Sequence, residues 1–286
     1  MKLFFFIALL FVAVYFFNRA YRNTKDIVVN RININTSNKK EQNVKLNILH
    51  LSDLHLENIS ISPNELYRKL KDESIDLVAL TGDFLDRKRT IPKLIPYLEA
   101  INRLNAKHGV FAVLGNHDYV LRKKNLKKLE ETLAAYGCKI LHNQNTTVYS
   151  QGKRINIIGI DDFSTGRSDM ELSYRGIQAG FNLVLTHDPN VVLDMKDYHF
   201  DYLLAGHFHG GQICYPKAYH LVKMGRLVRM NMIKGLQEYD NKLFYISEGL
   251  GQTGVNIRVG SRPEITVHKW TLAESVHRSE VLSSIS

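Results

Sequence analysis

Short apolar runs alternate with amphipathic stretches along most of the chain. Several runs have the length and the β-branched or aromatic content of buried strands, namely 46–51, 75–80, 109–114, 155–160, 181–186, 201–205 and 243–247. Between some of them, apolar residues recur at three- and four-residue spacings, which predicts helices over 63–73, 91–105 and 122–136. Ser62 and Pro63 fit the cap and the first turn of the first helix. This alternation indicates an α/β sandwich.

The beginning of the chain has a different pattern. Residues 3–17, LFFFIALLFVAVYFF, are uncharged and apolar on every side, so they do not fit a helix on the surface of a soluble domain. As a helix the run would span about 22 Å, less than the hydrocarbon core of a bilayer. A secretory signal would need small residues at a cleavage site, but the run ends in aromatic residues. We therefore expect an uncleaved, single-pass transmembrane anchor over 1–22.

Polar segments flank the predicted domain, which spans 45–270. Residues 23–44 are rich in Asn and Lys and predict a juxtamembrane stalk, with one candidate strand in DIVVNRININ at 26–35. Residues 271–286 are polar and predict a flexible tail. Basic residues follow the apolar run at 19, 22 and 25. By the positive-inside rule they favour a cell-membrane protein with its domain on the cytoplasmic side.

Composition and charge narrow the class of partner. The chain has 286 residues and is 44% hydrophobic, which allows a core of useful size. Its net charge of +10 predicts attraction to anions, whether phosphorylated ligands, nucleic acid or an acidic membrane surface. Cys138 and Cys214 fit neither a disulfide framework nor a zinc ribbon. The sequence carries no indication of the oligomeric state.

Polar side chains follow five of the predicted strands at their carboxyl ends. In chain order they are Asp53 and His55, then Gly82 and Asp83, then Gly115, Asn116, His117 and Asp118, then His187, and then Gly206, His207 and His209. The carboxyl ends of strands in open α/β sheets border the ligand crevice, so we expect these groups to meet at one place. Singly, each has an ordinary alternative role, such as a turn residue for Asp53 or Asn116. The ordered set indicates a shared site.

The chemistry of these side chains indicates a metal centre. Nitrogen and oxygen ligands without cysteine suit divalent Mn, Fe, Zn, Co or Ni. The candidate ligands are Asp53, His55, Asp83, Asn116, His187, His207 and His209. They are too many for one tetrahedral ion, and they fit two divalent ions that share a carboxylate. That arrangement is used to bind the attacking and leaving oxygens in phosphoryl hydrolysis.

The motifs resemble those of the calcineurin-like metallophosphoesterases. The matching motifs are D-L-H at 53–55, G-D at 82–83, G-N-H-D at 115–118, T-H at 186–187 and G-H-F-H at 206–209. The extension GHFHGGQ and the segment EGLGQTGVNIRVGSRPEITVH at 248–268 are similar to the membrane-associated bacterial branch of that family. The resemblance covers about 45–270 and is far more specific for the fold and metal site than for the substrate.

The resemblance implies a four-layer α/β/β/α sandwich, the metallo-dependent phosphatase fold. It implies one ion held by Asp53, His55, Asp83 and His209, and a second held by Asp83, Asn116, His187 and His207. Asp83 would bridge, and a hydroxide between the ions would attack phosphorus. His117 would be a catalytic residue that protonates the leaving oxygen. Asp118 would orient His117 through its other ring nitrogen.

The substrate is the least determined part. Residues 213–235 contain no acid but include Lys217, Lys223, Arg226, Arg229 and Lys234. They predict either a solvated basic loop or a wall that meets an anionic head group and an acyl chain. We expect a membrane-anchored phosphoesterase acting on a phosphodiester, pyrophosphate or phosphomonoester, with a phosphorylated small molecule or lipid as substrate. The alternatives are a nuclease or cyclic-nucleotide phosphodiesterase, and a non-catalytic metal-bearing docking module. The sequence has no aromatic-interleaved basic platform for single strands.

Overall fold

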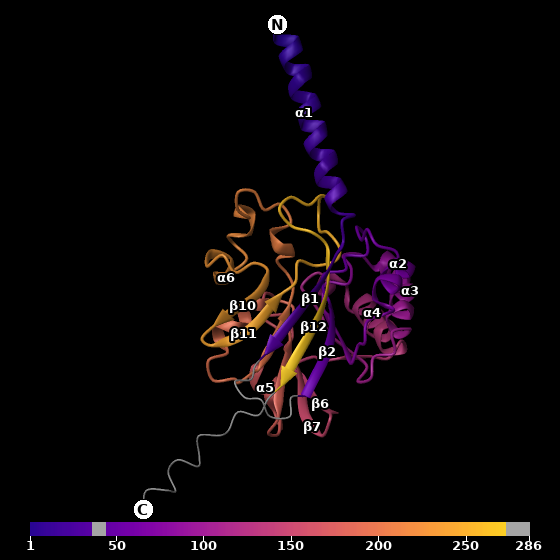
Figure 1. The fold of residues 1–286 in the computed structure, drawn as a ribbon, viewed down its shortest axis with the longest axis vertical. Helices are drawn as coiled ribbons and strands as arrows, with labels where there is room; N and C mark the ends of the chain where they lie inside the picture. Colours follow the sequence, from indigo (N-terminus) through magenta and orange to yellow (C-terminus); the bar gives the residue numbers. More distant parts are fainter. Residues whose placement is uncertain (36–43, 273–286) are drawn as a thin grey trace, which may run out of the picture.

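Two six-stranded sheets form the centre of the protein (Figure 1). The structure, a computed structural model, describes residues 1–35 and 44–272. In order across the first sheet lie β1 Val28–Asn35, β12 Glu264–Leu272, β2 Val44–Leu51, β3 Leu77–Thr81, β4 Val110–Val113 and β5 Cys138–Ile140. In order across the second sheet lie β10 Gly235–Tyr239, β11 Lys242–Ile246, β9 Tyr202–Ala205, β8 Phe181–Leu185, β7 Lys153–Gly159 and β6 Gln144–Ser150.

Helices cover the outer faces of both sheets. The α-helices of the domain are α2 Pro63–Leu70, α3 Ile91–Asn102, α4 Lys123–Ala135, α5 Met170–Tyr174 and α6 Arg226–Arg229. Short 3₁₀ helices are η1 Lys88–Thr90, η2 Asp118–Val120, η3 Pro189–Asp194, η4 His209–Gly211 and η5 Tyr219–Leu221. Helices α2, α3 and α4 pack on the first sheet, and the shorter helices gather over the second. This confirms the predicted four-layer α/β/β/α sandwich.

Strand β2 shows why the central strands are apolar at nearly every position. Leu46 and Ile48 point into the cluster between the two sheets, whereas Leu49 and Leu51 point into the cluster beneath the helices. Side chains alternate along a strand, so a strand covered on both faces must be apolar on both. Full burial of each such side chain contributes roughly 1.5–3 kcal/mol to the free energy of unfolding. This packing fixes the register that places the polar residues after β2.

The strands that carry the candidate site run in one direction within each sheet. Strands β2, β3 and β4 are parallel neighbours in the first sheet, and β7, β8 and β9 are parallel neighbours in the second. Their carboxyl ends therefore lie together within each sheet. In Figure 1 this is the end of the sandwich from which α1 leaves.

The predicted strands over 46–51, 75–80, 109–114, 155–160, 181–186, 201–205 and 243–247 are confirmed. The predicted helices are confirmed as α2, α3 and α4, each ending one to three residues before its predicted end. The candidate strand within 26–35 is confirmed as β1, which pairs in parallel with β12 and buries Ile34 between the sheets. The rest of the predicted stalk at 36–43 and most of the predicted tail, 273–286, lie outside the described residues.

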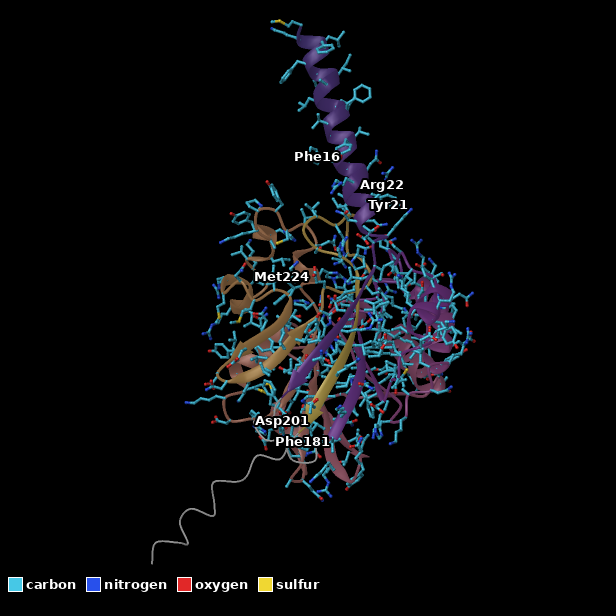
Figure 2. All side chains as sticks on the ribbon, viewed as in Figure 1. Phe16, Tyr21, Arg22, Phe181, Asp201 and Met224 are labelled. Atoms are coloured by element: carbon cyan, nitrogen blue, oxygen red, sulfur yellow. The ribbon has the colours of Figure 1, made fainter. Side chains whose placement is uncertain are left out.

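Helix α1, Lys2–Asn23, projects from the domain (Figure 1). Its 22 residues extend about 33 Å, whereas the apolar run at 3–17 alone would extend about 22 Å. The helix is long and apolar enough to cross a membrane, and along it only Ala20 is buried against the domain. Figure 2 places Phe16 on the projecting part and Tyr21 and Arg22 where the helix meets the domain. Residues 24–27 alone separate α1 from β1.

Candidate metal centre

The loops after the strands hold the candidate ligands in unusual backbone conformations. Asp53, His55, Asp83, His207 and His209 all have positive φ, between 34° and 75°. Non-glycine residues seldom adopt this left-handed region, and its strain persists only where surrounding structure holds it. Such strain gathers at functional sites. The backbone turns that aim these side chains at one another are therefore costly features of the fold.

Glycines directly before Asp83 and His207 allow the loops to approach closely. A Cβ atom at Gly206 would collide with the carboxylate of Asp53, which lies on the other sheet. The backbone N–H of His207 donates to both carboxylate oxygens of Asp53, at 3.1 and 3.2 Å. The absence of a side chain at 206 thus lets the two sheets join at the site.

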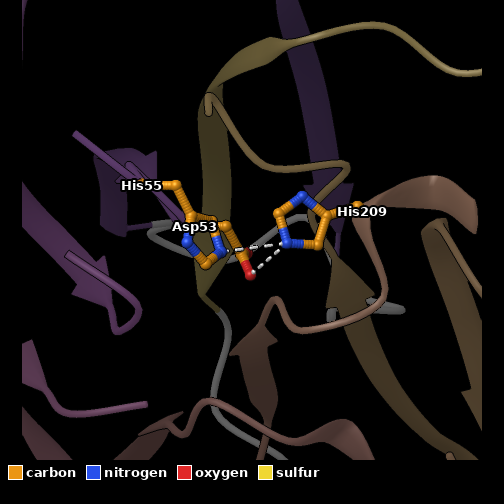
Figure 3. A group of neighbouring side chains, drawn as sticks. All are labelled: Asp53, His55 and His209. Atoms are coloured by element: carbon orange, nitrogen blue, oxygen red, sulfur yellow. Dashed lines mark hydrogen bonds and ion pairs between the residues drawn. The ribbon is translucent and has the colours of Figure 1, made fainter. Parts of the chain in front are cut away.

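The first group of ligands consists of Asp53, His55 and His209 (Figure 3). Nε2 of His209 lies 3.3 Å from Oδ1 of Asp53 and 3.2 Å from Nε2 of His55. All three side chains are buried. Figure 3 shows the Asp53 carboxylate and the His55 ring, both from the loop after β2, meeting the ring of His209 from the loop after β9. One carboxylate and two imidazoles at this spacing have the donor set of a site for a divalent ion.

The second group lies around Asp83. Oδ2 of Asp83 is 3.1 Å from Nε2 of His187, which in turn is 3.2 Å from Nδ1 of His207. The same Asp83 oxygen is 3.5 Å from Nε2 of His55 in the first group. Asn116 lines the same cavity as Asp83 and His207, and its buried Oδ1 has no hydrogen-bond partner. The structure thus brings all seven predicted ligands to one place.

The hydrogen bonds of the imidazoles show that a cation fits between these groups. Nδ1 of His187 lies 2.7 Å from the carbonyl oxygen of Thr81, which can only accept, so Nδ1 carries the proton. If the ring were neutral, Nε2 would present a lone pair toward the Asp83 carboxylate at 3.1 Å, and the two would repel. A positive charge, either a proton on Nε2 or a metal ion, is therefore needed at this contact. The donor set and the orphaned Asn116 oxygen both fit a metal.

The pKa values of the central histidines also reflect the negative charge of the neighbouring carboxylates. Burial disfavours a charged ring at His187, but the Asp83 and Asp53 carboxylates outweigh it and raise its pKa well above the usual value. At His55, burial is likewise outweighed by Asp86 and Asp83, so its pKa is also raised. Burial prevails at His209, whose pKa falls to about 3. The carboxylates therefore attract positive charge to the centre of the site.

His117 borders the cavity and is held by a different carboxylate than expected. Its Nδ1 lies 2.8 Å from Oδ1 of Asp86, and the same oxygen lies 2.9 Å from Nδ1 of His55. The expectation that Asp118 orients His117 is wrong. The Asp118 carboxylate accepts from the backbone N–H groups of residues 83, 84 and 115 instead. A buried carboxylate satisfied by three amides fixes the loops after β3 and β4.

Asp86 is therefore a residue that the sequence reasoning missed. It follows the G-D motif by three residues, in GDFLD, where a lone acid resembles a surface residue. It is partly exposed, and its contact with both histidines appears only once the loops fold together. Burial opposes ionisation of Asp86, but the hydrogen bonds from His117 and His55 hold its pKa below the usual value.

Two cavities open at the metal centre. One, of about 360 Å³, is bordered by Asp83, Asn116, His117, His207 and His209 on its inner side and by Ile213 and Val255 among its outer walls. The second, of about 610 Å³, shares His207 and Met224 with the first. Its wall includes Lys223, Arg226 and Arg229 from the basic segment 213–235. These basic residues therefore border a cavity that reaches His207 in the metal centre.

Comparison with known proteins agrees with this geometry. The family model for calcineurin-like phosphoesterases matches residues 46–211, and the chain belongs to this family of metal-dependent phosphoric ester hydrolases. It is 60% identical, over 254 residues, to a Bacillus subtilis protein called uncharacterized metallophosphoesterase YkoQ. That match covers 89% of this chain and 94% of the relative.

Two more distant relatives have names that state an activity. The chain is 27% identical over 251 residues to the UDP-2,3-diacylglucosamine pyrophosphatase LpxG of Chlamydia trachomatis, covering 69% of this chain and 74% of that protein. It is 25% identical over 196 residues to the phosphodiesterase YaeI of Escherichia coli, covering 68% and 70% respectively. These relatives act on different phosphorus–oxygen bonds, so the family alone does not define the substrate of this chain.

Proposed function

We propose that the chain is a membrane-anchored phosphoesterase that binds two divalent metal ions and hydrolyses a phosphodiester, pyrophosphate or phosphomonoester. The observation that carries this proposal is the position of Asp83. Its Oδ2 faces a ring nitrogen on each side, at 3.5 Å from His55 and 3.1 Å from His187. A carboxylate between two groups of ligands fits a bridge between two ions. The groups are Asp53, His55 and His209 on one side and Asn116, His187 and His207 on the other.

The residues around the ions have distinct parts in the proposed reaction. Bound divalent ions would neutralise charge on the phosphoryl oxygens and lower the pKa of water. Asp86 holds His117 through Nδ1, which leaves Nε2 to donate a proton to the leaving oxygen. Burial opposes a charged ring, but the Asp86 hydrogen bond and the Asp83 charge raise the pKa of His117 to about 9. In the protein without bound metal, the ring that would donate this proton is therefore protonated near neutral pH.

The second cavity supports a substrate larger than a simple phosphate ester. Its wall combines basic side chains with apolar ones, namely Lys223, Arg226, Arg229, Phe163, Leu193 and Met224. Basic groups bind phosphate oxygens, and an apolar wall accepts a ring or hydrocarbon. The pyrophosphatase LpxG, named for a diacylated nucleotide sugar, is consistent with such a ligand. We infer that the substrate is a lipid-linked phosphodiester or pyrophosphate.

Hydrogen bonds at the base of α1 support the proposal that the anchor is not cleaved from the domain. The backbone N–H of Arg258 donates to the carbonyl of Ala20 at 2.9 Å, and Nδ2 of Asn23 donates to the carbonyl of Arg258 at 2.9 Å. Cleavage that removed all of α1 would break this junction. The basic residues Arg19, Arg22 and Lys25 favour the cytoplasmic side for the domain. Rapid digestion of the domain by protease added to intact cells would contradict this orientation.

A substrate panel tests the proposed function. The full chain, purified in detergent and supplied with Mn²⁺, is offered bis(4-nitrophenyl) phosphate, a lipid pyrophosphate and single-stranded DNA. We expect hydrolysis of the nitrophenyl diester and faster turnover of the lipid pyrophosphate. Faster turnover of DNA would favour the nuclease alternative. Metal binding without hydrolysis of any of the three would favour a docking module.

A further inference from the structure

Ile213 and Val255 line the metal-site cavity, and the segment after Ile213 carries further apolar side chains that the described part of the chain leaves exposed. Ile213, Tyr215, Tyr219, Val222 and Val255 are all exposed, Tyr215 by 81% and Tyr219 by 66%. We call these five residues the mouth patch. Large apolar side chains gathered on one surface mark a contact with a protein or a membrane. Tyrosines in particular are enriched at the level of lipid head groups.

A chain of backbone contacts joins the mouth patch to the base of α1. Arg258 donates to the carbonyl of Ala20 in α1, and Val259 next to it forms a parallel bridge with Ile213. The side chain of Gln212 donates to the carbonyl oxygens of Thr253 and Val255. Figure 1 shows the gold loop before β12 and the orange loop after β9 at the end of the domain from which α1 projects.

The junction between α1 and the domain leaves little freedom of position. Residues 24–27 alone connect α1 to β1, and Thr24 and Ala20 are buried against the domain. The guanidinium of Arg258 is buried and donates to the carbonyl oxygens of residues 209, 248, 249, 251 and 262. The loop that receives α1 is thus tied to the backbone of a metal ligand, His209. A bilayer crossed by α1 must lie near the mouth patch.

The charges around the mouth patch indicate which membrane surface fits it. Lys217 and Lys223 are exposed among the apolar residues, and no acidic residue occurs between 206 and 235. Arg22 and Lys25 are exposed at the base of α1. Lys and Arg side chains near an anionic bilayer surface are attracted to it. The combination of apolar and basic groups complements acidic phospholipid.

We propose that the mouth patch docks on the surface of an acidic phospholipid bilayer, so that the metal-site cavity opens at the level of the head groups. Ile213 and Val255 belong both to the mouth patch and to the wall of the cavity, so the docked surface is continuous with the active site. A lipid-linked phosphate then reaches the metal centre from within the membrane without crossing bulk water. This inference rests on the anchoring proposed above.

The opposite end of the molecule supplies a matched control. Tyr149 in β6 is 56% exposed, close to the exposure of Tyr219, but β6 and β7 lie at the end of the sandwich away from α1 (Figure 1). A bilayer crossed by α1 therefore meets Tyr219 and not Tyr149. The cysteines permit single-site labelling, because Cys138 is buried and Cys214 is replaceable by serine.

The experiment compares two labelled positions in the full chain. Tyr219→Cys and Tyr149→Cys, each with Cys214→Ser, are labelled with an environment-sensitive fluorophore. They are reconstituted into vesicles of phosphatidylcholine with phosphatidylglycerol that contain a nitroxide-labelled lipid as quencher. We expect a blue-shifted emission and severalfold stronger quenching at 219 than at 149. The charge reversal pair Lys217→Glu with Lys223→Glu should lower the quenching at 219 severalfold.

Equal quenching at the two positions would overturn the proposed docking. Because fluorescence needs no turnover, this result is independent of the proposed function. Labelled proteins that hydrolyse bis(4-nitrophenyl) phosphate normally, yet show equal quenching, would refute the docking alone. Strong quenching at 219 in a protein that hydrolyses no phosphate ester would refute the proposed function alone.

Discussion

Two clusters of buried histidines lie close together in this molecule, and the carboxylates beside one of them shift the pKa values of two of its rings in the opposite direction from those of the other cluster. In the metal centre, His55 and His187 are surrounded by carboxylates, which raise their pKa values despite burial. Between the sheets, His50 and His268 pack among hydroxyl groups. Burial lowers the pKa of His50 to about 3 and that of His268 well below the usual value.

Thr81 lies between the two clusters and contacts both. Its hydroxyl is 2.8 Å from Nε2 of His50, and its carbonyl accepts from Nδ1 of His187 at 2.7 Å. On the far side of the inter-sheet cluster, Nδ1 of His268 lies 2.9 Å from the hydroxyl of Tyr202. Burial is therefore not what makes a metal site. The neighbouring carboxylates decide whether buried imidazoles attract a cation or stay neutral as part of the core.

The largest effect is expected from removing the shared carboxylate. Asp83→Ala should lose bound metal and about 10²–10³-fold in hydrolysis, the scale seen when preorganised charge stabilisation is removed. Elemental analysis and assay of bis(4-nitrophenyl) phosphate measure the two losses. The exposed Asp72→Ala is the control and should match the wild type. An Asp83 variant that retains both ions would contradict the bridging position.

His117→Ala should separate metal binding from turnover. The variant should retain its ions and lose about 10²–10⁴-fold in kcat, the usual contribution of general acid catalysis. Hydrolysis of an ester whose leaving group needs no proton, such as 4-nitrophenolate, should slow less than hydrolysis of an ester with an alkoxide leaving group. Normal turnover of an alkyl ester by this variant would remove the proposed role of His117.

Asp86→Asn should have a smaller effect of the same kind. Asp86 contacts both His55 and His117, so the variant should lose about 10–100-fold in metal affinity or activity, as expected when a group that orients a ligand is changed. Titration with Mn²⁺ under assay separates affinity from turnover. An unchanged metal affinity together with unchanged kcat would show that Asp86 positions neither ring.

The smallest effect on catalysis is expected in the inter-sheet cluster. His268→Gln keeps a partner for Tyr202 and should leave metal content and hydrolysis unchanged. Because the folded protein holds His268 neutral, the unfolded state binds its proton more readily below pH 6.5. The wild type should therefore lose about 2 kcal/mol more stability than the variant between pH 6.5 and pH 5. Urea unfolding with chelator present measures this difference. Parallel pH profiles of the two proteins would contradict the lowered pKa.

The sequence predicted the central strands and the meeting of their carboxyl ends, because those strands are buried on both faces and are followed by polar residues. It left more open where an element is half exposed. Residues 26–35 were a candidate strand within a polar segment, and nothing in their mixture of Asn, Arg and Ile predicts that β12 is the pairing partner of β1. The role of Asp86 depends on two loops meeting in space, and no local pattern marks it. The left-handed backbone at Asp53 and His207 is likewise invisible in the residue types.

Metal stoichiometry measured together with activity tests the central claim most directly. The purified full chain, stripped of metal, is titrated with Mn²⁺ while bound ions are counted by elemental analysis and cleavage of bis(4-nitrophenyl) phosphate is followed. We expect two ions per chain at saturation, with hydrolysis appearing as the second ion binds. A single bound ion at saturation, or full occupancy without cleavage of any phosphate ester, would contradict the account.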